Sequence, residues 1–488
     1  MDEFYGIDLG TTNSCIATID EDDLVVVVTN KEGLLTTPSV VAYNEKGIPY
    51  VGTAAKANLG NDPERTVAFI KREMSNNNYS RRIGNIQVDP VEISSLILKK
   101  LVDDANQKRK DEEGKDPIYR VVITVPAYFG NAERERTAEA GRRAGLDVIT
   151  LINEPTAAAM FFGKKNKQNR TILVYDLGGG TFDVSIMRIQ NGIMDTLATD
   201  GNHHLGGVDW DEAIVNYVLM KEGFTQNCKQ LNPQERGTLL LAAEDAKKIL
   251  STNDTTTIRF SYKGIHNVEI TKSQFEELTK DLMKQTSNLV DTALEMAGNP
   301  KIDDVLLVGG SSRMPMVKSF IEKKFNLSPK VFEPDLAVAK GAALFASQEA
   351  STKGYVKGAI QLGSDKGSAS YGIECFGMND VLKVSNLIIM NDDLEIRKEF
   401  DQFTTRYENQ TEVELAVHEN RVNGVDCDMA KAGDPLEKHV LNWGKPVPKG
   451  TPIKIIVDRG KDGIIHVWAG AVGHEVKFDI HTKGVSSN

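Results

Sequence analysis

The sequence predicts an α/β protein with mixed sheets over residues 1–350, followed by an all-β sandwich over residues 369–488. β-branched segments alternate with helical stretches throughout the first range. Within it, two short segments repeat one strand–turn–strand pattern with the same aspartate, glycine and threonine chemistry. Short alternating segments separated by turn residues dominate the second range, as expected of an antiparallel sandwich.

The two repeated segments are IDLGTTNSC at 7–15 and YDLGGGTFD at 175–183. In each, an apolar strand ends in an aspartate, glycine and threonine form the turn, and a second apolar strand follows. Glycine has no Cβ and tolerates positive φ, so backbone N–H groups can approach an anion closely, and threonine hydroxyls add donors. One such hairpin is usually an ordinary turn. Two in one chain predict a clamp for nucleotide phosphates.

The aspartates of the two hairpins, Asp8 and Asp176, predict a bound cation. A carboxylate cannot face phosphate directly, because like charges repel at close range. Magnesium suits this place, since it keeps several waters and is shared between carboxylates and substrate phosphates. We therefore expect a magnesium ion between these aspartates and the nucleotide.

Composition limits the classes of partner. The 488 residues allow two or three domains, each with its own core. A net charge of −11 and a pI near 5.4 argue against nucleic acid or an anionic membrane as the main partner, because both require basic patches. The four cysteines are scattered without a Cys-x-x-Cys pair, which indicates reduced thiols. No secretory signal or membrane-spanning run is present, so a cytoplasmic monomer is expected.

The remaining elements follow from apolar periodicity and composition. A charged stretch at 106–115 is expected to be a solvated helix end and loop. A segment rich in Gly, Ser and Lys at 351–368 indicates a linker. Strands are predicted at 121–125, 172–176 and 305–308, helices at 94–105 and 234–250, and sandwich strands at 413–417, 453–457, 464–468 and 476–480.

Four further segments carry side chains suited to a nucleotide, although each is ordinary on its own. In VGGSSRMP at 308–315, glycines let the backbone lie flat against a ligand and the arginine can stack on a base. One helix face carries a carboxylate, two cations and a hydroxyl. The other two are an acid opening a small-residue helix and a helix lysine. The residues are Gly309, Gly310 and Arg313; Glu244, Lys247, Lys248 and Ser251; Glu154; and Lys71.

Together these segments resemble the heat-shock chaperones of the DnaK type, which have an actin-like ATPase fold of two related lobes. The resemblance is nearly continuous as far as Gln348. Because the sequence stops at Asn488, soon after the sandwich, we expect a divergent member without the family's helical lid, either by nature or by truncation. The matching segments are GIDLGTTNS, VITVPAYF, INEPTAAA, YDLGGGTFDVSI, LGGVDWD, VGGSSRMP and EPDLAVAKGAA.

The resemblance implies an ATPase that uses ATP, Mg²⁺ and K⁺ and is slow, because no arginine finger is evident. Lys71 would orient the attacking water, with Glu154 and Asp176 as acidic partners. Asp8 and Asp176 would hold the waters of both cations, and Thr181 would lie near the γ-phosphate. The implied phosphate cradle is Gly10, Thr11, Thr12, Asn13, Gly178, Gly179, Gly180 and Thr181. The implied adenosine site is Glu244, Lys247, Lys248, Ser251, Gly309, Gly310, Ser311, Arg313 and Asp335. The implied allosteric switch is Pro126, Arg134 and Glu154.

The sandwich resembles the family's peptide-binding domain more distantly. Alternating strands always bury half of their side chains, so ordinary core or loop positions are an equally good interpretation of the cleft residues. The residues that fall near the apolar peptide cleft are Phe376, Met378, Val381, Val413 and Leu415.

Two departures from the family bear on coupling between the domains. Where relatives have a run of leucines in the linker, this chain has VKGAIQLGSD at 356–365, which predicts a flexible linker that docks poorly. Thr150 stands where relatives usually have a basic residue, which weakens the case for a J-domain co-chaperone bound in the usual way.

Two functions from different classes follow. The first is an ATP-hydrolysing chaperone whose sandwich binds extended apolar segments of unfolded proteins, assisted by a J-domain co-chaperone and a nucleotide-exchange factor. The second is a nucleotide-gated regulatory protein whose sandwich recognises one dedicated folded partner. A P-loop enzyme is excluded by the absence of Gly-Lys-Ser or Gly-Lys-Thr, and a sugar kinase has no need of the appended sandwich.

Overall fold

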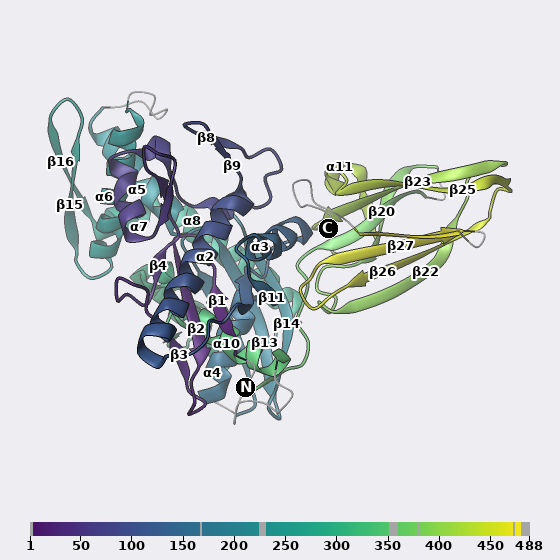
Figure 1. Ribbon diagram of the computed structural model, residues 1–488, viewed down its shortest axis with the longest axis horizontal. Coiled ribbons are helices and arrows are strands. Elements are labelled where there is room, and N and C mark those ends of the chain that lie inside the picture. The colour runs from purple at the N-terminus through teal and green to yellow at the C-terminus, as the bar shows by residue number, and fades with distance from the viewer. Residues whose placement is uncertain are drawn as a thin grey trace.

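The computed structural model describes residues 3–165, 168–223, 231–350, 360–377, 380–471 and 474–479. Its α/β part ends with helix α10 (Ala337–Ala350), and its β-sandwich begins with strand β20 (Ser370–Phe376). Figure 1 shows the sandwich beside the α/β part, next to helix α3 (Asn131–Arg143). The predicted α/β architecture followed by an all-β sandwich is confirmed.

The first large sheet has the strand order β11-β10-β1-β2-β3, with β4 also paired to β2. The β1–β2 hairpin is antiparallel, and β10 lies parallel to β1 on its other side. Helix α10 packs so closely on β1 that a Cβ at Gly6 would collide with the backbone of Ala342 and Ala343. The strands are β1 (Tyr5–Asp8), β2 (Asn13–Ile19), β3 (Val25–Val27), β4 (Thr37–Pro38), β10 (Arg120–Val125) and β11 (Asp147–Asn153).

The second large sheet repeats this plan in the order β18-β17-β12-β13-β14-β19. The β12–β13 hairpin is antiparallel and β17 lies parallel to β12, as β10 does to β1. Strand β12 is buried almost throughout, which explains its nearly continuous apolar sequence. The strands are β12 (Arg170–Leu177), β13 (Phe182–Gln190), β14 (Ile193–Asn202), β17 (Asp304–Val308), β18 (Lys330–Val331) and β19 (Gln361–Leu362).

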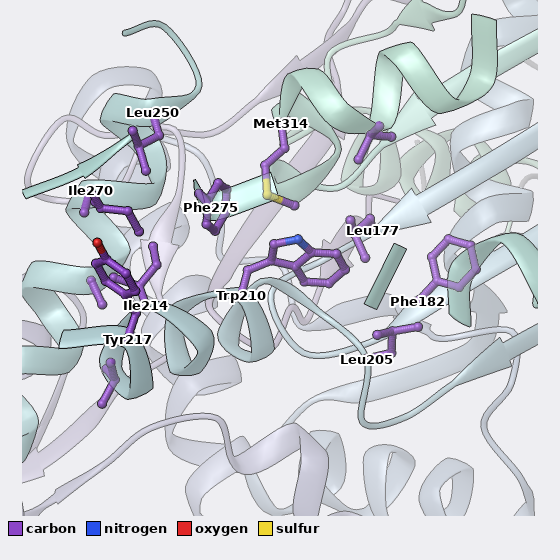
Figure 2. Close-up of a cluster of buried hydrophobic side chains, with 14 of the residues drawn as sticks. Leu177, Phe182, Leu205, Trp210, Ile214, Tyr217, Leu250, Ile270, Phe275 and Met314 are labelled. Atoms are coloured by element: carbon purple, nitrogen blue, oxygen red, sulfur yellow. The ribbon is translucent and has the colours of Figure 1, made fainter. Parts of the chain in front are cut away.

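A large apolar core supports the second hairpin (Figure 2). Trp210 of helix α5 lies at its centre, fully buried, with Met314 and Leu177 beside it. Phe182 and Leu205 extend the cluster, and all of these side chains have at most 2% of their surface exposed. Burial of aromatic groups of this size stabilises the fold strongly, so the turn between β12 and β13 rests on a rigid base.

Helices pack on both large sheets of the α/β part. Each large sheet with the helices packed on it is called a lobe. Helix α2 (Pro90–Lys108) continues into the π-helical turn η4 (Arg109–Glu113), so the expected helix end at 106–115 is present. No helix within the described ranges combines the length and hydropathy needed to cross a membrane. The other helices are α1 (Thr53–Ala57), α4 (Glu154–Lys165), α5 (Gly207–Lys221), α6 (Pro233–Leu250), α7 (Lys272–Leu278), α8 (Lys280–Met296) and α9 (Pro315–Phe325), with the 3₁₀ turns η1 (Asn58–Gly60), η2 (Pro63–Arg65), η3 (Ile70–Glu73) and η5 (Gly310–Arg313). The small sheets are β5 (Val41–Tyr43) with β6 (Pro49–Val51) and β7 (Thr66–Val67), β8 (Arg81–Ile83) with β9 (Ile86–Val88), and β15 (Thr255–Ser261) with β16 (Ile265–Thr271).

The sandwich consists of two antiparallel sheets, β24-β21-β20-β23-β25 and β22-β26-β27-β28. Their inner faces meet in one core that includes Trp443, Ile455 and Val467, as alternation along the strands predicts. The elements after β20 are β21 (Leu382–Ile388), β22 (Ile396–Thr404), β23 (Gln410–Asn420), β24 (Asp426–Asp428), α11 (Met429–Ala432), β25 (Glu437–Val447), β26 (Pro452–Arg459), β27 (Ile465–Ala471) and β28 (His474–Asp479).

The linker docks, contrary to the expectation from its polar sequence. Residues 351–359 lie outside the described ranges, but strand β19 pairs in parallel with β14 and Ile360 is 1% exposed. The backbone N–H of Thr196 also donates to the carbonyl of Ser364 at 2.9 Å. Strand addition of this kind uses main-chain hydrogen bonds, and Ile360 and Leu362 add apolar contacts, so a continuous run of leucines is not needed.

Candidate functional site

The turns of the two hairpins open into one cavity of about 540 Å³ between the lobes. They belong to different sheets, and the other walls come from η3, α4, α6 and η5. The cavity therefore gathers most of the nucleotide-site residues that the sequence predicted, and the roles assigned to them stay predictions. Those lining it are Asp8, Gly10, Thr11, Thr12, Asn13, Lys71, Glu154, Asp176, Gly178, Gly179, Thr181, Glu244, Lys247, Lys248, Ser251, Gly309, Gly310, Ser311, Arg313 and Asp335.

The turns pack against each other as well as facing the cavity. A Cβ at Gly179 would collide with the side chain of Thr12, and one at Gly180 would collide with that of Thr11. Gly180 does not itself line the cavity, and its carbonyl accepts a hydrogen bond from Arg72 Nε at 2.9 Å. The threonines of one turn thus occupy the space that the glycines of the other leave open. Such a Gly- and Thr-rich cradle fits phosphate oxygens.

The floor of the cavity holds a charged cluster. Lys71 forms an ion pair with Glu154, and their side chains are only 6% and 10% exposed. Burial raises the pKa of Asp176 well above its usual value, and the neighbouring carboxylates Glu154, Asp183 and Asp8 raise it further. Burial and the nearby charge of Glu154 raise the pKa of Asp8 to about 7, although the positive charge of Lys71 lowers it. An excess of enclosed carboxylates fits a hard cation such as Mg²⁺, which would hold Asp8 and Asp176 ionised.

Helix α6 forms the opposite wall. Glu244 pairs with Lys248 on its own helix at 2.6 Å and with Lys56 of α1, across the cavity, at 2.7 Å. Burial raises the pKa of Glu244, but the two lysines outweigh it and hold the value at about 2. Lys248 is mostly exposed, whereas Lys247 is buried and donates to the carbonyl of Gly207 at 2.9 Å.

Sequence reasoning missed two charged residues of this wall, Lys56 and Asp211. Asp211 is 5% exposed and forms an ion pair with Lys247 at 2.8 Å. Burial raises the pKa of Asp211 to about 6 against the opposing effect of Lys247. Asp211 lies in the LGGVDWD segment that contributes to the family resemblance, whereas no pattern around Lys56 distinguishes it from a surface lysine.

Two of the three predicted switch residues lie outside the cavity. Pro126 is buried just after strand β10 ends. Arg134 is 2% exposed and donates to Asn153 Oδ1 at 2.6 Å and to the carbonyl of Asp462, in the sandwich, at 3.1 Å. Asn153 directly precedes Glu154 in the chain and also donates to Asp365 of the linker at 3.0 Å. A continuous set of hydrogen bonds therefore joins the cavity wall to the linker and the sandwich.

The start of helix α3 makes the other main contact with the sandwich. The backbone N–H of Asn131 donates to Glu419 Oε2 at 2.9 Å, and Asn131 Oδ1 accepts from the backbone of Ile465 at 2.9 Å. The guanidinium of Arg421 lies 4.0 Å from the ring centroid of Tyr128. These contacts are polar and local, so they fix orientation without a large apolar interface.

The predicted peptide-cleft residues divide by burial. Phe376 and Val381 are exposed at the surface. Val413 packs against the sandwich core, and Leu415 is part of that core at 4% exposure. Met378 lies outside the described residues. The assignment of these residues to a peptide cleft stays a prediction.

Comparisons with known proteins agree with the geometry. A family model described as "Hsp70 protein" matches residues 4–87 and 75–487. The chaperone protein DnaK of Thermotoga petrophila is 40% identical over 484 residues, which cover 96% of this chain and 78% of that protein. The chaperone protein DnaK of Thermosipho melanesiensis is 41% identical over 483 residues, with the same shares covered.

Proposed function

Because this chain belongs to the Hsp70 family and is an ATP-dependent chaperone of the DnaK type, we propose how its parts divide the work. The cavity binds ATP and hydrolyses it slowly, and the sandwich binds extended apolar segments of unfolded polypeptides. The main support is the convergence of two hairpins from separate sheets on one cavity with a buried Lys71–Glu154 pair at its floor. The alternative of one dedicated folded partner gains no support from the relatives, which are named as chaperones.

In this proposal the chain acts mainly by positioning and by neutralising charge. Backbone N–H groups of the two turns and the hydroxyls of Thr11, Thr12 and Thr181 bind the phosphate oxygens. Lys71, held by Glu154, orients the attacking water toward the γ-phosphate. Magnesium, held through water by Asp8 and Asp176, would neutralise phosphate charge, and potassium would accompany it.

Slow turnover is expected from the position of the arginine in the cavity. Within the described residues, Arg313 is the arginine that lines it, and it pairs with Asp335 on the wall proposed for adenosine. Phosphoryl transfer is accelerated by roughly 10³- to 10⁵-fold when an arginine contacts the transferring group. Without one at the floor, hydrolysis serves as a timer.

We further propose that the nucleotide state reaches the sandwich through Arg134, Asn153 and the docked linker. The hydrogen bonds of Arg134 to Asn153 and Asp462 support this route. The proposal includes a J-domain co-chaperone and a nucleotide-exchange factor as partners, and a monomer in the cytoplasm. The free cysteines Cys15, Cys375 and Cys427 fit a reducing compartment.

Replacement of Lys71 tests the assigned chemistry. Lys71→Ala should lower single-turnover hydrolysis by roughly 10²- to 10⁴-fold, because the attacking water loses its positioning group. ATP affinity, measured by calorimetry, should change little. Lys99→Ala, at a lysine that is 57% exposed on α2, is the matched control and should hydrolyse ATP normally. Unchanged turnover in Lys71→Ala would overturn the role.

A further inference from the structure

Several apolar side chains are exposed where the β20–β21 and β22–β23 loops come together. Phe376 and Leu382 face each other across the β20–β21 pair and are 49% and 37% exposed. Val381 and Tyr407 are more exposed, at 64% and 61%. Strand β20 begins at Ser370, which pairs with Asn420 beside the contact of Glu419 with helix α3, so the strand runs away from the α/β part. We call these four residues the end patch.

Arg406 spans the end patch. Its guanidinium carbon lies 3.4 Å from the ring centroid of Phe376 and 5.3 Å from that of Tyr407. Its Nη2 is 3.2 Å from Asp380 Oδ1 in the opposite loop. A cation stacked on an aromatic ring is held in place by the ring quadrupole, and a planar guanidinium still presents donors along its edge.

The loop that carries Arg406 is held firmly by its own backbone contacts. The N–H of Arg406 donates to Gln410 Oε1 at 3.0 Å, and the N–H of Thr405 donates to the carbonyl of Thr451 at 2.9 Å. The hydroxyl of Thr405 donates to the carbonyl of Pro448 at 2.7 Å. The guanidinium therefore sits on a fixed support, as a residue that selects ligands must.

The partner of Arg406 is easily displaced. Asp380 is 80% exposed and Arg406 is 31% exposed, and ion pairs in such positions contribute little because solvent competes for both charges. Lys383, the cation on the neighbouring strand, has its own partner in Asp426 at 2.6 Å. The overall charge of −11 disfavours acidic ligands at a distance, but charges beyond about 8 Å are screened at physiological salt. Direct contact with the Arg406 guanidinium therefore decides which ligand charge is preferred at the end patch.

We propose that Arg406 is a specificity-determining residue that selects, among extended apolar segments, those with a carboxylate side chain beside the apolar residues. The inference rests on the proposed function, in which the sandwich binds unfolded polypeptide. The client carboxylate takes the place of Asp380 on the guanidinium edge, in a bidentate pair where geometry allows. The apolar residues of the client pack on Phe376 and its neighbours.

Three fluorescent peptides with one apolar core test this inference, differing at a single flanking residue that is Glu, Gln or Lys. Their affinities for the full chain are measured by anisotropy in ADP and Mg²⁺. The Glu peptide should bind roughly three- to fivefold more tightly than the Gln peptide, and the Lys peptide more weakly than both. The preference should shrink at about 0.5 M salt, because the pair is exposed. Asp380→Asn should tighten the Glu peptide about twofold, since it removes the competing carboxylate.

Two variants assign the preference to a residue. Arg406→Gln should no longer bind the Glu peptide more tightly than the Gln peptide. Arg397→Gln is the matched control, because Arg397 also stacks on an aromatic ring, that of Trp468 at 5.4 Å, but on the other sheet, and it should keep the preference. Equal binding by the unaltered chain, or a preference that survives in Arg406→Gln, would overturn the inference alone. Failure of all three peptides to bind would overturn peptide binding by the sandwich, and the inference with it.

Discussion

The two hairpins that face the cavity begin alike and differ at their turns. In both hairpins an aspartate at or next to the end of the first strand is followed by leucine and glycine, but the first turn continues Thr11-Thr12 and the second continues Gly179-Gly180. The structure shows why they differ, because each threonine fills the space above one of the glycines. The repeat is therefore complementary: one hairpin supplies side chains and the other supplies room for them. The two turns can pack this closely only because one carries threonines where the other carries glycines.

The largest expected effect comes from filling that space. Gly179→Ala should weaken ATP binding at least tenfold and lower the free energy of unfolding by about 1–3 kcal/mol, because the new methyl collides with Thr12. The second variant, Thr12→Ala with Gly179→Ala, should recover part of the stability, because it removes the two closest atoms of Thr12 but keeps its Cβ, 2.9 Å from the new methyl. Calorimetric unfolding of the single and double variants measures the coupling, expected to be about 1–2 kcal/mol.

A glycine elsewhere provides the control for this cycle. No atom outside its neighbours lies within 4 Å of a Cβ built on Gly424, so Gly424→Ala should change the free energy of unfolding by less than about 0.5 kcal/mol. Strictly additive effects of Thr12→Ala and Gly179→Ala would show that the two turns do not interlock.

A smaller effect is expected from replacing the buried aspartates of the two hairpins. The pKa of Asp176 is higher in the folded protein than in the unfolded chain. As the pH rises through about 4, the carboxyl of Asp176 ionises in the unfolded chain but stays protonated in the folded protein. The folded protein therefore loses stability until the pH passes the folded pKa. Asp176→Asn removes this cost. Without nucleotide it should raise the unfolding temperature at pH 8 but hardly at pH 4.

The same substitution should weaken nucleotide binding that depends on Mg²⁺, because a ligand of the cation's waters is lost. Asp8→Asn should show the same trend, since the pKa of Asp8 is raised to about 7. Thermal unfolding with and without Mg²⁺ and ADP measures both changes. A lower unfolding temperature for nucleotide-free Asp176→Asn at pH 8 would contradict the role given to the charged floor.

Sequence alone predicted the parts of the cavity that depend on local chemistry. A strand that ends in aspartate before a glycine and threonine turn is seldom an ordinary turn when it occurs twice in one chain, and both turns lie where they were expected. Residues such as Lys56 could not be found, because only the tertiary fold brings α1 opposite Glu244. Asp211 belongs to a segment that carries the family resemblance, but its place in the wall depends on Lys247 of another helix.

The sandwich and the linker were harder to predict for a physical reason. Alternation identifies strands but not which exposed apolar residues bind a ligand, so Leu415 of the core and Phe376 of the surface looked alike. The linker was expected to dock poorly because its apolar run is interrupted. Its docking combines backbone pairing with β14, which any sequence can make, with burial of Ile360 and packing of Leu362, two apolar residues that the interrupted pattern does not single out.

Control of the sandwich by the nucleotide, transmitted through the docked linker, joins the two halves of the proposed function. Its sharpest test is the affinity of a fluorescent unfolded peptide for the full chain, compared in saturating ATP and ADP with Mg²⁺ and K⁺ present. We predict weaker binding in ATP, and loss of that difference in Asp365→Ala, which removes the hydrogen bonds from Asn153 and Thr156. Peptide binding that is the same in ATP and ADP would contradict the proposal.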